Sequence, residues 1–446
     1  MLCIASVALL WHNILCLKYC RKGIVLAVPE LISLEDAREL VLPHVEAMDV
    51  EEVGILDMIG RVAAEDLKSD IDIAPFAHSA MDGFAVRALQ VEGAAPDSPV
   101  ELDVIAEVPA GAWYGGEIGD GECVRIMTGA PLPEAADAVV KYEIVDVVSG
   151  DGREGSRVAF TKPATAGDNI RSAGEEAKAG EVIVHAGEVV HSAGIGFLAG
   201  CGVTRCKTHR RPTIAIIATG SELVEPTEVP TKGKIRNSNS YALAACAVDA
   251  GAVPTVLPIS PDDFEGLRAA VVAATADYDF VVTSGGAANG DYDFIKKVVD
   301  DAGELLMSTV NMRPGKAQTF GIVNGTPVFG LPGNPAAAYL GFEMIIRPAL
   351  RKMQGYSHFE RPHVSAKLTA PIKKKDPRRI FDRATLTKSP EGEYEVTPAK
   401  NQSSGLFGPI QKANCFVVLP EGEARTYEVG EFVDCVLLDI PEEVLL

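Results

Sequence analysis

The sequence between residues 211 and 354 places the strongest constraint on the fold, because buried-strand and helix patterns alternate there. Residues 213–218 form a continuous apolar run, which is typical of a strand covered on both faces. Similar runs return at residues 253–259 and 278–283, with helical patterns between them. Strands that alternate with helices at this spacing predict a parallel sheet with helices on both faces.

Local signals divide this α/β region into elements. Ser260 and Pro261 have the residue types of a helix N-cap and first helical position, so we expect a helix to start there. Asn324-Gly325 lies between two apolar runs and predicts a hairpin turn. The other expected helices lie at about residues 240–250, from about residue 291, and at residues 340–350.

The sequence on either side of this region predicts different structures. Ser33 caps an expected helix over residues 33–48, and a second helix is expected at about residues 50–59. Residues 62–206 break into short β-like pieces divided by Gly, Pro and Asp. Beyond residue 355, short alternating runs favour a small antiparallel sheet or barrel. These runs are residues 380–386, 394–397, 415–419 and 432–438.

Charge and cysteine content limit the functional classes. The 446 residues include 41 basic and 62 acidic side chains, which gives a net charge of −21. This charge argues against a protein that binds nucleic acid by broad phosphate neutralisation. The nine cysteines lack the spacing of a disulfide framework or a zinc site, so we expect reduced thiols in a cytoplasmic protein.

The N-terminal segment fits neither a secretory signal nor a full membrane span. Residues 2–17 are largely apolar and are followed by Lys18, Arg21 and Lys22. A secretory signal carries its positive charge before the apolar run, and a membrane span needs about 20 apolar residues. We therefore expect residues 1–30 to be a disordered extension or a mis-assigned start, with a membrane anchor as the alternative. Since no other segment could span a bilayer, we expect no membrane partner.

Three sets of loops leave the carboxyl ends of the predicted strands, where open α/β sheets bind ligands. They are residues 219–223, residues 283–291, and residues 313–316 together with residues 331–335. The glycine-rich loop 283–291 could aim backbone N–H groups at an anion, and a simple tight turn is the other interpretation. Lys316 could supply a positive charge for a phosphate, although most lysines are solvated surface residues.

Acidic residues recur in these loops and in two motifs further upstream. Carboxylates beside an anion pocket repel the ligand unless a hard cation lies between them. Mg²⁺ held by carboxylates and phosphate oxygens meets this need. Each acid taken singly is more simply a helix cap or a solvated residue, and only the set together indicates a metal site. The acids are Glu222, Asp262, Asp291, Asp293, Asp82 and Glu176.

Eight motifs occur in one order along the chain, and together they resemble the molybdopterin molybdenumtransferase family, known as MoeA in bacteria and as the gephyrin E domain in animals. The resemblance runs from about residue 33 to the C-terminus. The first motif, residues 75–86, reads Pro-Phe-Ala-His-Ser-Ala-Met-Asp-Gly-Phe-Ala-Val. The others lie at residues 125–130, 136–140, 169–175, 218–223, 284–286, 314–316 and 331–335.

The resemblance implies a multidomain fold, α/β plus β, in an elongated homodimer. It implies irregular β-rich N-terminal domains, a parallel-sheet molybdopterin-binding domain and a small C-terminal β-barrel, with the helix of residues 33–48 packed on the α/β domain. The expected domains are an N-terminal domain of residues 31–75 and 151–210, an inserted β-rich domain of residues 76–150, the α/β domain of residues 211–354, and the barrel domain of residues 355–446.

The resemblance also implies a reaction and its residues. The family transfers molybdenum from molybdate (or tungsten from tungstate) to adenylylated molybdopterin, uses Mg²⁺ and releases AMP. In the dimer, the loops of Asp82 and Thr128 are expected to complete the cleft of the partner's α/β domain. The matching catalytic positions are Asp82, Thr128, Glu176, Glu222, Asp262 and Asp293, of which Glu222, Asp262 and Asp293 would hold Mg²⁺. The matching substrate-binding positions are Ser284, Gly285, Gly286, Gly290, Lys316, Pro332, Gly333, Asn334, Pro335 and Arg383.

Three alanines depart from the family pattern. Ala288 and Ala337 stand where the family usually has serine, and Ala317 stands where it has proline. Two hydroxyl donors near the oxyanion site are therefore missing, and each charge-assisted hydrogen bond is worth about 1.5–3 kcal/mol. Two other functions stay open on the same fold: a non-catalytic molybdopterin-binding paralogue, acting as a carrier or dimeric scaffold, and a phosphoanhydride hydrolase.

Overall fold

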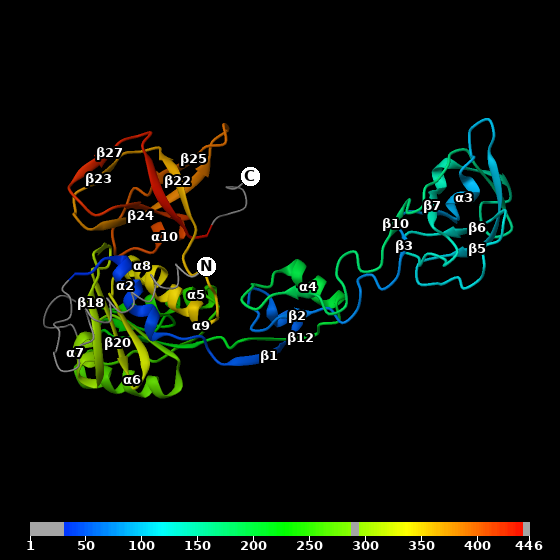
Figure 1. The fold of residues 1–446 in the computed structure, drawn as a ribbon. Helices are drawn as coiled ribbons and strands as arrows, with labels where there is room; N and C mark the ends of the chain where they lie inside the picture. The colour runs from blue at the N-terminus through cyan, green and yellow to red at the C-terminus, as the bar shows by residue number, and fades with distance from the viewer. Residues whose placement is uncertain (1–30, 287–293, 440–446) are drawn as a thin grey trace, which may run out of the picture. The chain divides into compact units, whose positions relative to one another are not determined.

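The computed structural model describes residues 31–286 and 294–439. These residues form two compact units, one of Val50–Thr208 and one that joins residues 31–49 to residues 209–439 (Figure 1). The predicted N-terminal extension, residues 1–30, lies outside the described residues. None of the helices in the described ranges is long and apolar enough to cross a membrane.

The larger unit contains the predicted parallel sheet, with one addition. Its strands lie in the order β16-β13-β17-β21-β20-β18, and the first four are parallel. β20 and β18 continue the sheet in antiparallel pairing, so the sheet is mixed rather than wholly parallel. The strands are β13 (Thr213–Ala218), β16 (Val253–Val256), β17 (Phe280–Ser284), β18 (Gly303–Thr309), β20 (Ala317–Val323) and β21 (Thr326–Leu331).

Helices cover both faces of this sheet, because successive residues of a strand point to opposite faces. Ile214 and Ile216 of β13 pack with residues of α5, α8 and α9, whereas Ala215 and Ile217 pack with residues of α6 and α7. Figure 1 shows these two helical layers on either side of the strands. The helices are α5 (Asn239–Asp249), α6 (Phe264–Asp277), α7 (Phe294–Ala302), α8 (Pro335–Gly341) and α9 (Arg347–Met353), with a π-helical turn (Phe342–Ile346) between the last two.

The predicted hairpin is confirmed, whereas the predicted start of α6 is wrong. Asn324 and Gly325 have φ values of 53° and 83° and connect the paired residues of β20 and β21, as a two-residue turn requires. The N-cap of α6 is Asp263, whose Oδ1 accepts from the Gly266 N–H at 2.8 Å. Ser260 instead forms a parallel bridge with Thr219, so the extended chain continues past the expected cap.

The N-terminal helix is shorter than predicted. α2 (Leu34–Val41) begins after its cap Ser33, whose Oγ accepts from the Asp36 N–H at 3.0 Å. It gives way to a 3-10 turn (Leu42–His44) at Pro43, which has no N–H for a helical hydrogen bond. The apolar side of α2 lies in the core of the α/β domain, together with residues of α5 and the sheet.

The second predicted helix, at residues 50–59, is wrong. The chain forms β1 (Val50–Gly54) and a 3-10 turn (Ile55–Met58) there, and β1 pairs with β12 (Arg205–His209). The pairing partner lies about 150 residues away along the chain, so local helix propensity could not reveal it.

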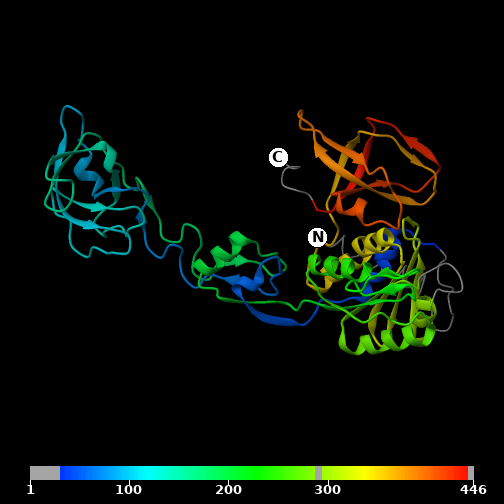
Figure 2. The ribbon, with the colours of Figure 1, turned by 180° about the vertical axis from the view of Figure 1, so that it is seen from behind.

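The C-terminal barrel is confirmed. Its strands pair in the order β24-β25-β22-β28-β26, and β26 pairs back onto β24 to close the ring. Figure 2 shows the barrel domain in orange and red. β19 (Met312–Arg313) joins β24 in parallel, which ties the barrel to the segment that follows β18. The barrel strands are β22 (His363–Leu368), β24 (Arg379–Lys388), β25 (Tyr394–Pro398), β26 (Cys415–Leu419) and β28 (Phe432–Leu437). A separate ribbon joins β23 (Ile372–Lys374) to β27 (Arg425–Tyr427).

The unit Val50–Thr208 is built mainly on a six-stranded sheet with the order β7-β4-β6-β5-β9-β8. β9 belongs to this sheet, which therefore continues past the predicted boundary at residue 150. The strands are β4 (Gly83–Val86), β5 (Val100–Val108), β6 (Glu122–Ile126), β7 (Ala138–Lys141), β8 (Val145–Ser149) and β9 (Arg157–Phe160). The rest of the unit includes the short pairs β2 (Leu67–Lys68) with β11 (Val182–Val184) and β3 (His78–Ser79) with β10 (Ile170–Arg171), and α4 (Ser192–Gly200).

Candidate active site

A cavity of about 1360 Å³ lies in the larger unit, between the carboxyl ends of the parallel strands and the barrel. This is the edge at which open α/β sheets bind ligands. Most of the predicted site residues line it, and they come from the loops after β13 and β16, the end of β17 and the turn after it, the loops before β20 and after β21, and β24. They are Glu222, Asp262, Ser284, Gly285, Gly286, Lys316, Pro332, Gly333, Asn334, Pro335 and Arg383.

The remaining predicted positions are elsewhere. Gly290, Asp291 and Asp293 lie outside the described residues. Asp82, Thr128 and Glu176 belong to the unit Val50–Thr208 and are not part of the cavity lining.

The two described acids of the α/β side are brought together by the ends of neighbouring strands. Thr219 and Ser260 form a parallel bridge beyond β13 and β16, and the Thr219 hydroxyl donates to the Pro261 carbonyl at 3.2 Å. Glu222 follows Thr219 in the same loop, Asp262 follows Ser260 and Pro261, and both acids are exposed and line the cavity. The result is an acidic wall on one side of the cavity.

A glycine turn after β17 forms the floor next to this wall. Gly285 has a φ of 96° and packs so closely that a Cβ placed on it would lie 2.2 Å from the Thr219 carbonyl oxygen. The Gly285 N–H donates to the Leu331 carbonyl at 3.2 Å, so this turn and the loop after β21 lie side by side. Glycine at this position lets the backbone of the turn approach the end of β13.

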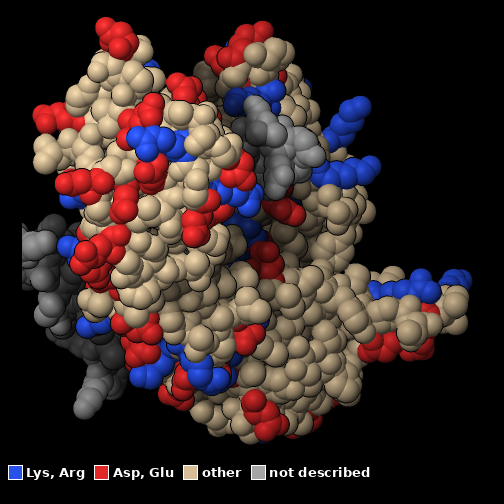
Figure 3. Space-filling model, turned by 90° about the vertical axis from the view of Figure 1, so that its right-hand side faces the viewer, with Lys and Arg blue, Asp and Glu red and all other residues tan. Residues whose placement is uncertain are grey.

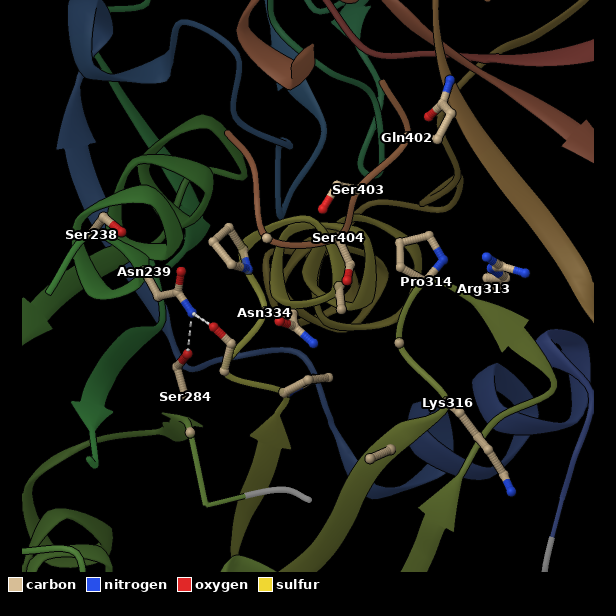
Figure 4. Close-up of a pocket in the computed structure, with 18 of the residues that line it drawn as sticks. Ser238, Asn239, Ser284, Arg313, Pro314, Lys316, Asn334, Gln402, Ser403 and Ser404 are labelled. Atoms are coloured by element: carbon tan, nitrogen blue, oxygen red, sulfur yellow. Dashed lines mark hydrogen bonds between the residues drawn. The ribbon is translucent and has the colours of Figure 1, made fainter. Parts of the chain in front are cut away.

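Asn239 holds the same two loops together. Its Nδ2 donates to the Ser284 Oγ at 2.8 Å and to the Gly333 carbonyl at 2.9 Å (Figure 4). Sequence reasoning missed this residue, because its bonds reach 45 and 94 residues along the chain. The signal available in the sequence was that Asn239 is a polar residue close to the expected start of a helix.

We expect Gly285→Ala to lower the free energy of unfolding of this unit by about 2–4 kcal/mol, because it adds both a strained φ and a clash. Gly233→Ala is the matched control: its φ is 84°, but no heavy atom lies within 4 Å of an added Cβ. The control should cost only about 1–2 kcal/mol. Native-state hydrogen exchange of the β13 and β17 amides measures both values. Equal losses in the two variants would contradict the close packing described for Gly285.

A second part of the lining, which we call the basic wall, comes from the loop before β20 and from the barrel, where Asp382 is its one acidic member. Arg383 is only 1% exposed, and its Nη2 donates to the Ser403 carbonyl at 3.2 Å, while its Nε has no hydrogen-bond partner among the described residues. Burial lowers the pKa of Arg383, but arginine stays charged at neutral pH. Lys316 follows the positive-φ residue Gly315 and lines the same cavity, as do Ser403 and Ser404. Figure 4 shows Ser403 and Ser404 on the barrel segment and Lys316 on the loop before β20.

In the other unit, two predicted site residues are bonded to each other. The Asp82 Oδ1 accepts from both the backbone N–H and the hydroxyl of Thr128, each at 2.7 Å. These two bonds lower the pKa of Asp82, so its carboxylate is ionised at neutral pH. Gly83, the first residue of β4, lets this strand lie close to β7, because a Cβ there would lie 2.1 Å from the Val140 carbonyl oxygen. Glu176 is exposed, and its N–H donates to the Ile73 carbonyl at 3.1 Å.

Comparisons with known proteins cover nearly the whole described chain. Family models match residues 32–202 (MoeA N-terminal region, domains I and II), 215–352 (probable molybdopterin binding domain) and 365–438 (MoeA C-terminal region, domain IV). A molybdopterin molybdenumtransferase of Bacillus subtilis is 36% identical over 411 residues, which is 91% of this chain and 94% of that protein. One from Staphylococcus aureus is 34% identical over 418 residues, 93% of this chain and 98% of that protein.

A solved structure gives the same result. The crystal structure of a molybdopterin biosynthesis MoeA protein from Pyrococcus horikosii is 33% identical and superposes with a TM-score of 0.77, covering 91% of this chain and 99% of that one. Sequence and fold therefore agree over both described units, and the resemblance seen in the eight motifs is confirmed. The chain belongs to the molybdopterin molybdenumtransferase (MoeA) family of enzymes.

Proposed function

We propose that this protein inserts molybdenum from molybdate into adenylylated molybdopterin and releases AMP, as a step of molybdenum cofactor biosynthesis. The observation that carries the proposal is the cavity, whose lining combines an acidic wall, a glycine turn and a basic wall. Two anionic reactants need such a divided site, because each must be bound without being repelled by the other. The homologous enzymes are named molybdopterin molybdenumtransferases, which supports molybdopterin as one reactant and the transfer of molybdenum to it.

The pterin phosphate is assigned to the glycine turn and the loop after β21. Ser284 and Gly333 are held by Asn239, and Asn334 precedes α8, whose first residue is Pro335. Small residues and turn geometry leave backbone N–H groups near the ligand without side-chain obstruction. These residues position the substrate rather than react with it.

Mg²⁺ fits the acidic wall. Glu222 and Asp262 both line the cavity, and two carboxylates together with substrate phosphate oxygens are a donor set that suits this cation. Asp293 is proposed as a third ligand. When bound there, Mg²⁺ would neutralise charge on the phosphates during cleavage of the phosphoanhydride bond. The carboxylates of this chain hold the cation and keep other anions away from that end of the cavity.

The oxyanion is assigned to Lys316 and Arg383. Ala317 and Ala337 line this part of the cavity in place of the family's proline and serine. Ser403 and Ser404 line it too, from the barrel side, so hydroxyl groups are available there despite the alanines. The unsatisfied Nε of Arg383 offers a further donor, since a buried guanidinium N–H without a partner is costly.

The site is completed, in our proposal, by a second copy of the chain. Asp82 and Thr128 form one bonded pair in the unit Val50–Thr208, and a homodimer would present this pair to the partner's cavity. We also propose a cytoplasmic location, which is supported by the free cysteines at positions 123, 201, 206, 246, 415 and 435, since thiols persist in reducing compartments.

The function is tested by supplying adenylylated molybdopterin and Mg²⁺ with molybdate, with tungstate or with neither, and measuring AMP release. We expect release to depend on the oxyanion. Release that ignores the oxyanion would indicate a phosphoanhydride hydrolase. Tight pterin binding without any release would indicate a non-catalytic carrier or scaffold.

A further inference from the structure

The barrel wall of the cavity carries a run of three lysines that the proposed function leaves unused. Alternate side chains of the strand β23 (Ile372–Lys374) point to opposite sides, and Lys375 follows directly after it. Lys374 is 2% exposed, and its Nζ donates to the Asp376 and Gly422 carbonyls at 2.6 and 2.9 Å. Lys373 and Lys375 are exposed and line the cavity. The strand geometry therefore gives one lysine a structural role and turns the other two toward the site.

The cavity has a local charge opposite to that of the protein. Seven basic and three acidic side chains line it, although the whole chain carries a net charge of −21. On the face shown in Figure 3, acidic side chains are spread over much of the surface. A cleft with one sign of charge concentrates ligands of the opposite sign, so the excess of basic groups indicates an anion.

Lys373 and Lys375 are the basic groups of the barrel side whose charge is not already used. Arg313 and Arg378 both pair with Asp376, at 3.3 and 2.5 Å, and Arg378 holds the pKa of that carboxyl well below its usual range. Among the described ion pairs, none involves Lys373 or Lys375. Asp376, the acid next to Lys375 in sequence, is thus occupied by arginines and leaves the lysine charges free for a ligand.

We propose that Lys373 and Lys375 form an outer anion subsite for a tetrahedral oxyanion that carries two negative charges. This inference rests on the proposed function, in which Lys316 and Arg383 form the inner oxyanion site. The outer subsite takes either the free oxyanion on its way in or the phosphate of the nucleotide on its way out, because the two groups share shape and charge. It determines the affinity for these anions and takes no part in bond cleavage.

The test measures equilibrium binding of molybdate alone and of AMP alone to the full-length protein. We expect the double variant Lys373→Gln/Lys375→Gln to raise the dissociation constant of at least one of them about tenfold at ~20 mM salt. The effect should shrink to about twofold near 0.3 M salt, where screening is strong. The matched control is Lys367→Gln/Lys412→Gln, which removes the same charge from barrel residues outside the cavity lining.

The outcomes separate this subsite from the proposed function. A change for molybdate supports an entry role, and a change for AMP alone supports an exit role at the same subsite. If neither constant changes more than in the control, or if the wild type binds neither anion at low salt, the subsite does not exist. Oxyanion-stimulated AMP release by the wild type tests the proposed function separately. If Lys316→Gln lowers the affinity for molybdate but Lys373→Gln/Lys375→Gln does not, the proposed function stands and the outer subsite is ruled out.

Discussion

Asp82→Asn is expected to reduce oxyanion-dependent AMP release by about 10²- to 10⁴-fold, the range typical of losing a charged group that acts on the reaction. An asparagine Oδ1 can still accept both bonds that Thr128 donates to Asp82, so the turn should keep its shape while the charge is lost. Since these bonds lower the pKa of Asp82, the carboxylate protonates only below its ordinary value of about 4. Activity that depends on its charge should therefore persist down to that pH.

Asp66→Asn is the matched control for this variant. Asp66 is an exposed acid of the same unit, and its Oδ1 likewise accepts a backbone N–H, that of Ala186, at 2.9 Å. The control should retain wild-type AMP release within about twofold, because a solvated carboxylate away from the reactants contributes little. If both variants lose activity equally, the loss reflects the net charge of the unit rather than a role of Asp82.

Mixing two inactive variants tests whether the site is shared between subunits. Lys316→Gln removes a residue of the cavity, and Asp82→Asn removes a residue of the other unit. In a mixed dimer with a shared site, one of the two sites has both native residues, so a random mixture should regain about a quarter of the wild-type rate. The measurement is AMP release by mixtures of the two variants in which the subunits have been allowed to exchange. A mixture that stays inactive would mean that each chain supplies its own Asp82.

Glu343→Gln is expected to lower the free energy of unfolding by about 3 kcal/mol. Glu343 is 2% exposed, and its Oε2 lies 2.9 Å from the Arg361 Nε and 4.0 Å from the Arg347 Nε. Burial lowers the pKa of Arg347 to about 10, which still leaves it charged at neutral pH. Removing this buried negative charge leaves Arg347 without its carboxylate partner and Arg361 with only the exposed Asp249, and this costs several kcal/mol.

The control variant removes the other carboxylate that pairs with Arg361. Arg361 Nη2 also pairs with Asp249 at 2.9 Å, but the Asp249 side chain is 60% exposed, so Asp249→Asn should cost at most about 1 kcal/mol. Hydrogen exchange of the slowest β13 and β17 amides reports the free energy of unfolding in each variant. A loss below 1 kcal/mol for Glu343→Gln would show that Arg361 is satisfied by its bond to the Leu438 carbonyl and by water.

The Arg361 contacts also connect the two parts of the larger unit. One side chain contacts α5 through Asp249, the π-helical turn through Glu343 and the end of the barrel through the Leu438 carbonyl. Because the cavity is lined from both the sheet loops and the barrel, we expect Glu343→Gln to weaken substrate binding as well as folding. Rigid support of the residues around a site is needed to keep it in its productive geometry.

The sequence predicted the elements whose signals are local. The apolar runs at β13 and β17 are buried on both faces, as their composition indicated, and the Asn324-Gly325 turn needs only two residues with positive φ. Loops after such strands meet at one edge, so the order of the strands and loops along the chain was enough to assign Glu222, Ser284 and Asn334 to a common site. The hydrophobic periodicity of a strand and the residue types of a turn depend only on residues that are near in sequence, so tertiary packing does not change them.

Features that depend on distant pairing were decided by the tertiary structure alone. Residues 50–54 became a strand because β12 pairs with them, and Asn239 became a site residue because β17 and the loop after β21 end beside it. The barrel wall is a further case: nothing near Lys373 or Ser403 in sequence shows that they line the same cavity as Glu222, and Arg383 was expected there only from the family resemblance. Local sequence specifies each strand and turn, whereas the contacts between elements depend on free energies summed over the whole packed unit.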